Sequence, residues 1–300
     1  MRNALGQLAI PEAADVRRTV GRVAIGSARA LRKNPNMLMG VVIIIVMTSM
    51  ALAAPLITAY DPIRLVPANR LIVPGAKHWF GTDQLGRDIY TRVAYGARVS
   101  LQVGALVAIF VAVFGTAIGI VSGYFRPLDG PIMRLMDALL SFPSFLLTIA
   151  LVAAMQAGVW TVIAAIAIVD TPRMARLARA SVLTLRERDF VEAARAIGAR
   201  PLRITMVHIL PNSLAPIFVQ ATFVFAVAIL TEAGLSFLGT GVPPEVPTWG
   251  NIMGDGRRVA QVAPWVIFFP GLFLSLTVLG VNLVGDGLRD VLDPKLRGKL

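Results

Sequence analysis

Carboxylates in apolar surroundings are the residues of this sequence most able to do chemistry. Glu232 lies inside a long apolar stretch, and Asp137 and Asp170 bound another that carries no charge. Ionisable groups are costly inside a bilayer and usually face a cavity or a partner, so these side chains could relay protons. A structural interpretation stays open for all three. Gly234 and Gly239 indicate that the helix of Glu232 is nearing its end, where a paired or headgroup-level glutamate is tolerated.

Other kinds of chemistry have little support in the sequence. No Gly-x-x-x-x-Gly-Lys-Ser/Thr stretch is present to hold nucleotide phosphates. The chain has no cysteine, and its two histidines, His78 and His208, fall on opposite sides of the expected membrane. Neither a metal cluster nor a hydrolase triad is therefore indicated. We expect no catalytic residue, no bound metal and no cofactor held by this chain.

The most informative polar stretch is 192–211, EAARAIGARPLRITMVHILP. Its arginines indicate that it faces water or another protein rather than lipid. A helical period predicts a short amphipathic helix flanked by Glu192 and Arg195. The chain should turn after it, because Gly198 is permissive in backbone and Pro201 cannot continue a helix. The apolar side of this helix is expected to consist of Val191, Ala193, Ala194, Ile197 and Gly198.

This loop resembles the cytoplasmic signature loop of permease subunits in bacterial ABC importers. The positions in register are Glu192, Ala193, Ala194, Gly198, Leu210 and Pro211. His208 departs from the general pattern, which has Ile there, and the HILPN form is similar to the peptide and nickel branch. The resemblance implies that 192–198 is a coupling helix docked on a cytoplasmic ATPase, and that Arg195, Ile197 and His208 join the coupling residues. The alternative is an ordinary amphipathic cytoplasmic loop of an unrelated membrane protein.

Two further stretches carry the resemblance. GTDQLGRDIYTRVAYGARVSL at 81–101 is similar to a segment of the C-type permease subunit of dipeptide and oligopeptide importers, and TEAGLSFLG at 231–239 adds to it. The resemblance implies half of a heterodimeric pore that moves peptides by alternating access. Its implied partners are a B-type permease, two ATP-binding subunits that carry ATP and Mg, and an extracytoplasmic substrate-binding protein.

Several interpretations remain open within this resemblance. Glu232 would contact the translocation path or the second permease. The cargo is not readable, because relatives of this type carry dipeptides, oligopeptides, nickel chelates, glutathione or opines. The rival hypotheses are a proton-coupled secondary transporter that uses the three carboxylates, and a structural membrane scaffold.

Composition places the chain among membrane proteins. Of its 300 residues 56% are hydrophobic and 15% are charged, more apolar surface than a soluble fold can hide. The formal charge of +12 would suggest nucleic acid, but its distribution among the loops explains it better. We therefore expect membrane lipids around the chain and no nucleic acid.

Apolar runs predict an all-α protein of six transmembrane helices, since about 20 apolar residues cross a bilayer. The stretch 135–169 is too long for one span, so a break near 156–158 is expected. The other predicted spans are 37–59, 101–121, 212–238 and 265–284, with a polar turn at 124–134. The expected divisions are an arm at 1–36, a first span with its outer connection at 37–98, a core at 99–285 with the coupling loop at 171–211, and a cytoplasmic tail at 286–300.

Two segments should serve packing or the membrane surface. Gly115, Gly119 and Gly123 are four apart, a spacing that lets two helices approach closely in lipid. Residues 12–33 carry an apolar and a basic face and predict an N-terminal interfacial helix. A solvated basic tail is the alternative for that segment.

The basic residues set the expected orientation. If both termini and the coupling loop are cytoplasmic, 21 of the 29 Lys and Arg lie on that side and 8 on the other. This asymmetry predicts a multi-pass protein of the cytoplasmic (inner) membrane with both termini cytoplasmic. Six of the 8 lie in 60–98, more than a short outer connection should hold.

Overall fold

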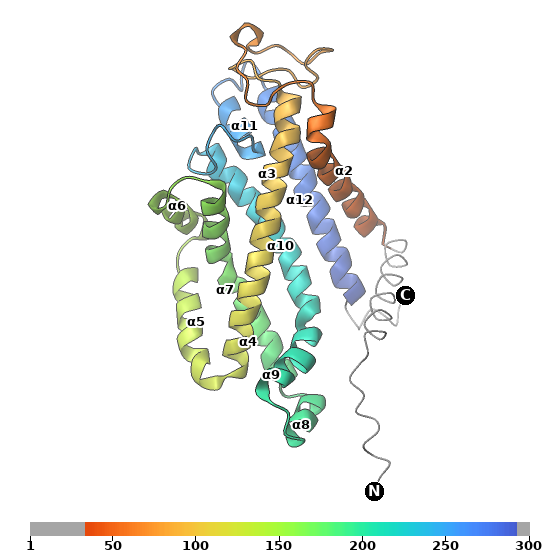
Figure 1. Ribbon diagram of the computed structural model, residues 1–300, viewed down its shortest axis with the longest axis vertical. Helices are drawn as coiled ribbons and strands as arrows, with labels where there is room; N and C mark the ends of the chain where they lie inside the picture. The colour runs from red at the N-terminus through yellow and green to blue at the C-terminus, as the bar shows by residue number, and fades with distance from the viewer. Residues whose placement is uncertain (1–33, 293–300) are drawn as a thin grey trace.

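The computed structural model describes residues 34–292, and within them the chain is an elongated bundle of helices (Figure 1). The helix predicted at 12–33 and the last residues of the tail lie outside the described residues. The connection 58–88 forms one end of the bundle, and α8 (Asp189–Ala196) lies at the opposite end.

The first described helix, α2 (Pro35–Ile57), begins with a side-chain N-cap. The Asn34 side chain accepts a hydrogen bond from the Met37 amide, and Pro35 starts the helix, where its missing N–H costs nothing. α2 packs on α12 (Trp265–Leu292), and a Cβ on Gly40 would lie 2.6 Å from the carbonyl oxygen of Gly280. The absence of a side chain at Gly40 therefore allows α2 and α12 to approach each other closely.

One continuous helix of 36 residues extends beyond both ends of the predicted second span, 101–121. It consists of α3 (Ile89–Phe110), the π-helical turn η2 (Val111–Gly115) and α4 (Thr116–Tyr124). At 1.5 Å per residue it is about 54 Å long, longer than the ~30 Å hydrocarbon core. The helix must therefore extend beyond the bilayer or tilt within it.

The polar turn predicted at 124–134 is wrong, because a helix begins there after the single residue Phe125. This helix is α5 (Arg126–Leu140), and Pro127 lies in its first turn, where no helical hydrogen bond is lost. α6 (Ser144–Ala154) follows at a bend of 90°. The predicted break near 156–158 is confirmed, since α7 (Val159–Leu185) starts after Gly158.

The second half of the chain returns through the bundle. The short turn α9, the π-helical turn η3 and α10 form one helix of 37 residues. α11 follows at the end opposite α8, and α12 then runs back along the bundle beside α2 (Figure 1). The remaining elements are η1 (Pro67–Asn69), α9 (Pro201–Arg203), η3 (Ile204–Ile209), α10 (Leu210–Phe237) and α11 (Trp249–Gly256).

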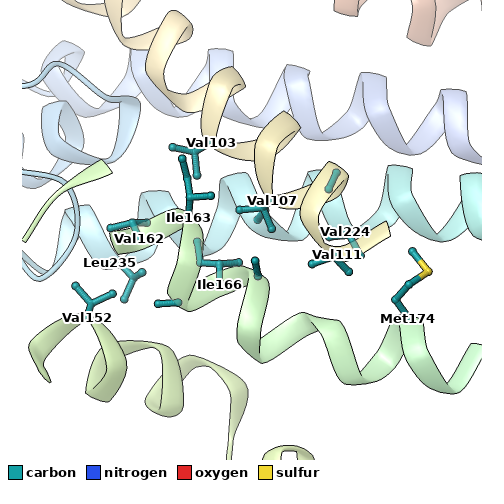
Figure 2. Packing of buried hydrophobic residues seen from close by; sticks show 14 of the residues in the cluster. Val103, Val107, Val111, Val152, Val162, Ile163, Ile166, Met174, Val224 and Leu235 are labelled. Carbon is teal, nitrogen blue, oxygen red and sulfur yellow. The ribbon is translucent and has the colours of Figure 1, made fainter. Parts of the chain in front are cut away.

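The main apolar core lies between α3, α6, α7 and α10. Figure 2 shows Val103 and Val107 of α3 close to Ile163 and Ile166 of α7, and Val152 of α6 near Leu235 of α10. Within lipid this packing must stabilise the bundle by close contact, because lipid tails are as apolar as these side chains. The core holds together the helices that lead to both ends of the molecule.

The predicted count of six spans is only approximate. Among the described residues, four helices are long and apolar enough to cross a membrane: α2, the helix formed by α3 to α4, the helix formed by α9 to α10, and α12. The bent pair of α5 and α6 makes a fifth if it is one span. α7 is the remaining predicted span; it carries Asp170 near its middle and Arg173, Arg176 and Arg179 in its second half.

Candidate functional site

The α8 loop is closed by a specific backbone turn at Gly198. This residue has φ of +80°, its N–H donates to the Arg195 carbonyl, and the Ala199 N–H donates to the Ala194 carbonyl. The two bonds are those of a helix C-terminus that ends in a left-handed residue. A Cβ at Gly198 would meet no atom within 4 Å, so backbone conformation alone favours glycine there.

One side of α8 is fixed to the body of the protein. Val191 and Ala194 are buried in a small apolar cluster with Val182 of α7 and with Ile204 and Ile209 of η3. The cluster joins α8 to both of the long helices that enter and leave the loop. A force on α8 would therefore act on α7 and α10 together.

The other side of α8 is open. Ile197 is 83% exposed, and Phe190 and Ala193 are also exposed. Ile197 was expected on the same side as Val191 and Ala194, but the helix ends at Ala196 and the turn directs Ile197 outward. Ile197 therefore forms an exposed apolar tip at the end of α8.

Glu192 and Arg195 flank this apolar tip and are exposed. They border a polar cleft of about 450 Å³. Its other lining residues are Tyr124 of α4, Arg126 of α5, and Arg186 and Glu187 beyond α7. The exposed end of the loop thus combines an apolar tip with a charged cleft.

The remaining residues of the loop pattern lie at the start of α10. Pro211 has no N–H and its ring crowds the carbonyl four residues earlier, which accounts for the π-helical turn η3 immediately before it. His208 lies in that turn with its ring 6.4 Å from the ring of Phe190 in α8. Leu210 is half-buried and Pro211 is exposed. The structure thus brings His208 close to α8.

Three glycines of η2 and α4 let these two elements approach α7 closely. A Cβ on Gly115 would lie 2.6 Å from the Cβ of Met174, and one on Gly119 would lie 2.5 Å from the carbonyl oxygen of Ala175. A Cβ on Gly123 would lie 2.9 Å from the Cβ of Val182. Because atoms cannot approach so closely, a larger side chain would force the helices apart.

Glu232 is fully buried in a hydrogen-bond network. Its Oε1 accepts from the Ser236 hydroxyl at 2.8 Å, and its Oε2 accepts from the Ser100 hydroxyl at 3.2 Å. The Ser100 oxygen in turn accepts from the Trp249 amide at 3.3 Å. The carboxylate therefore joins α10, α3 and α11, and in this conformation it does not line an open path.

The other two carboxylates are paired with arginines of α7. Asp170 Oδ1 accepts from Arg173 at 2.8 Å, and Asp137 Oδ1 accepts from Arg176 at 2.6 Å. A third pair joins the same helices: Arg179 donates two hydrogen bonds to Asp129 of α5 at 2.5 and 2.6 Å. The sequence predicts a polar turn at Asp129, and for this reason it does not indicate the ion pairs between α5 and α7.

A second ionic cluster, also missed, lies near the end opposite α8. Asp83 Oδ2 accepts from Arg87 at 2.6 Å and from Arg92 at 2.8 Å, and Asp255 Oδ2 accepts from the same arginines at 2.7 and 2.9 Å. Arg92 is 1% exposed and Asp83 is fully buried. Asp255 lies 163 residues beyond Arg92, a separation at which no local pattern signals pairing.

Metal ligands do not gather in the part of the chain that the structure describes. Residues 34–292 contain no group of three or more His, Asp and Glu side chains placed to hold a metal ion. His78 and His208 lie in separate regions, and the Nδ1 of His78 is 2.9 Å from Asp88.

Comparison with known proteins gives consistent matches over nearly the whole chain. Residues 113–298 match the family described as binding-protein-dependent transport system inner membrane component, and residues 26–74 match the N-terminal TM domain of oligopeptide transport permease C. The chain is 48% identical to the dipeptide transport system permease protein DppC of Alkalihalophilus pseudofirmus, over 90% of this chain and 89% of that protein. It is 40% identical to the oligopeptide transport system permease protein OppC of Bacillus subtilis, over 89% of this chain and 88% of that protein.

A solved structure shares the fold. A chain of the inward-facing MetNI methionine ABC transporter superposes with a TM-score of 0.56 at 20% identity, covering 67% of this chain and 97% of that chain.

Proposed function

The chain belongs to the family of binding-protein-dependent transport system inner membrane components, and from this we propose that it is the C-type permease subunit of an ATP-driven peptide importer. The observation that carries the proposal is the 48% identity, over 90% of the chain, to a permease of a dipeptide transport system. The identity to an oligopeptide permease supports the same class of cargo.

α8 is the coupling helix in this proposal. Its buried side joins it to α7 and α10 through Val191 and Ala194, and its exposed side presents Ile197 to a partner. An ATP-binding subunit would hold this tip and push on it when ATP binds. The coupling residues are those of the signature loop: Glu192, Ala193, Ala194, Arg195, Ile197, Gly198, His208, Leu210 and Pro211.

The proposed partners follow from the family. A second permease of the B type completes the pore, two ATP-binding subunits carry ATP and Mg, and an extracytoplasmic binding protein delivers the peptide. This chain then contributes the path and the coupling surface, and hydrolysis takes place on its partners.

The proposed orientation places α8 in the cytoplasm, together with both termini. The distribution of basic residues supports it. The six basic residues in 60–98 are an exception to this distribution. Two of them, Arg87 and Arg92, form ion pairs with buried or half-buried aspartates. These ion pairs explain how two arginines are accommodated at this end of the bundle.

A proton-coupled carrier is not supported. The chain is related to permeases of binding-protein-dependent systems over nine-tenths of its length. Asp137 and Asp170 each pair with an arginine, and Glu232 is enclosed by Ser100 and Ser236.

Uptake of a labelled dipeptide by the reconstituted importer tests the coupling proposal. The variant Ile197→Ser removes the exposed apolar tip but leaves the buried side of α8 intact. We expect transport to fall by more than about tenfold, because hot-spot contacts at interfaces contribute about 2 kcal/mol or more. The matched control is Val262→Ser, which removes a 71% exposed aliphatic side chain between α11 and α12, and it should transport normally.

Two outcomes would count against the proposal. Normal uptake by the Ile197→Ser variant would remove the coupling role of the tip. Absence of ATP-dependent uptake in the unmodified complex, with any peptide tested, would favour the scaffold hypothesis.

A further inference from the structure

A pocket of about 290 Å³ lies between the end of α2 and the start of α3, at the end of the bundle opposite α8. Three aromatic side chains line it, together with an exposed lysine and a buried aspartate: Tyr60, Trp79, Tyr90, Lys77 and Asp88. The coupling surface and the ionic clusters do not use this pocket. Its lining combines both signs of charge with aromatic rings.

The position of the pocket corresponds to the depth of lipid headgroups. Ile57 is both the last residue of α2 and part of the pocket wall. Leu56, immediately before it, is 88% exposed, as expected of a side chain that faces lipid tails. A span of 23 residues is about 35 Å long, so the residues just beyond its end lie where the hydrocarbon gives way to headgroups.

The buried carboxylate can accept a further hydrogen bond. Asp88 Oδ1 is 2.9 Å from Nδ1 of His78, and Oδ2 accepts from the amide and hydroxyl of Thr91 at 2.8 and 2.7 Å. Each carboxylate oxygen can accept about two hydrogen bonds, so Oδ1 has capacity for one more. A primary ammonium group, which donates three hydrogen bonds and accepts none, complements this oxygen.

The aromatic rings suit the same cation. The rings of Trp79 and Tyr90 lie with centroids 4.9 Å apart, and Tyr60 lies 4.9 Å from the ring of His78. Cations bind over the faces of Trp and Tyr rings. Lys77 lies at the exposed rim of the same pocket and offers a positive charge that can donate a hydrogen bond to a phosphate.

We propose that this pocket binds the headgroup of a phospholipid with a primary amine, such as phosphatidylethanolamine. The ammonium lies between Asp88 and the aromatic rings, and the phosphate lies at Lys77. Phosphatidylglycerol lacks the ammonium, and phosphatidylcholine has a cation but no N–H donor for Asp88. The bound lipid would fix the connection 58–88 against the ends of α2 and α3.

Native mass spectrometry of the purified transporter complex tests the proposal. The complex is stripped of lipid and offered equal amounts of phosphatidylethanolamine, phosphatidylglycerol and phosphatidylcholine, and the retained lipids are counted. We expect preferential retention of phosphatidylethanolamine, with phosphatidylcholine retained less. The variant Asp88→Asn should lower the preference by about tenfold, because a hydrogen bond to a charged group contributes about 1.5–3 kcal/mol.

This variant is a fair test because asparagine caps a helix about as well as aspartate, so the start of α3 is preserved. Asp61→Asn is the matched control: it makes the same change in the same connection but outside the pocket lining. Lys77→Ala should weaken retention of both phospholipids. Equal retention of phosphatidylethanolamine and phosphatidylglycerol, or an unchanged preference in the Asp88→Asn variant, would overturn the proposal. The readout is lipid binding, so it is independent of whether the complex transports peptides.

Discussion

Arg87 and Arg92 show how buried charges can be tolerated near a membrane. Each donates to both Asp83 and Asp255, so two positive and two negative charges form one neutral cluster. Burying an unpaired charge would cost several kcal/mol, whereas a paired and hydrogen-bonded cluster avoids most of that penalty. The cluster attaches the start of α3 and the connection before it to α11.

Removal of one carboxylate from this cluster should be strongly destabilising. The variant Asp83→Ala leaves two buried arginines with Asp255 alone, and breaking a buried pair costs about 3–5 kcal/mol. We expect a clearly lower midpoint in thermal unfolding of the purified complex. Glu245→Ala removes an exposed carboxylate from the connection between α10 and α11 and should leave the midpoint nearly unchanged. Equal midpoints in the two variants would show that the cluster contributes little.

At the level of elements, the close contact between α4 and α7 connects the α8 loop to the core. Gly119 lies so close to α7 that an added Cβ would be 2.5 Å from the Ala175 carbonyl oxygen and 2.6 Å from the Ala178 Cβ. The contact lies along the helix whose last turn packs on α8 through Val182. A movement of α8 is therefore transmitted to helices that cannot slide freely past one another.

A methyl group is enough to test this contact. Gly119→Ala should destabilise the complex by about 1–3 kcal/mol, because overpacking forces the helices apart. Gly130→Ala introduces the same methyl group within α5, where it would meet no atom within 4 Å. That control should be neutral or stabilising by up to about 1 kcal/mol, since alanine favours helix over glycine. Chemical or thermal unfolding of both variants measures the difference, and a neutral Gly119→Ala variant would contradict the packing account.

Local pattern was sufficient for several spans and for the turn that closes the α8 loop. Apolar runs locate α2 and α10 to within two residues and the start of α12, and the position of Gly198 agrees with its left-handed backbone. The end of α12 was predicted wrongly, because the helix continues through polar residues to Leu292, eight residues beyond the predicted 284. The sequence was misleading where local signals conflict with packing. Pro127, Gly130 and Pro131 suggest a turn, yet ion pairs to α7 hold this segment as α5.

Contacts between residues far apart in the chain could not be predicted from local sequence patterns. The hydrogen bond between Glu232 and Ser100 joins residues 132 positions apart, so an interior position for the carboxylate could be named only as one alternative. Ile197 was placed on the wrong side of α8 because the helical period was carried one residue past the end of the helix. Local periodicity predicts a face only as far as the helix continues.

At the scale of the whole molecule, the two ends of the bundle have different properties. One end is fixed by the ionic cluster, by Glu232 and by the buried Trp249, whose indole N–H donates to the Val93 carbonyl at 3.1 Å. The other end presents α8 with an exposed apolar tip. In the proposed function, the subunit receives force at one end and transmits it through long helices, and such a subunit is expected to have two different ends.

Site-specific crosslinking from Ile197 tests this account most directly. The native chain contains no cysteine, so an Ile197→Cys variant gives this chain a single attachment point for a photoreactive thiol reagent, and it can be labelled before the complex is assembled. We predict a crosslink to the ATP-binding subunit from this position, and none from the Val262→Cys variant at the opposite end. A crosslink to lipid or to the extracytoplasmic binding protein, or labelling of the Ile197→Cys variant in intact cells by a membrane-impermeant reagent added outside, would contradict it.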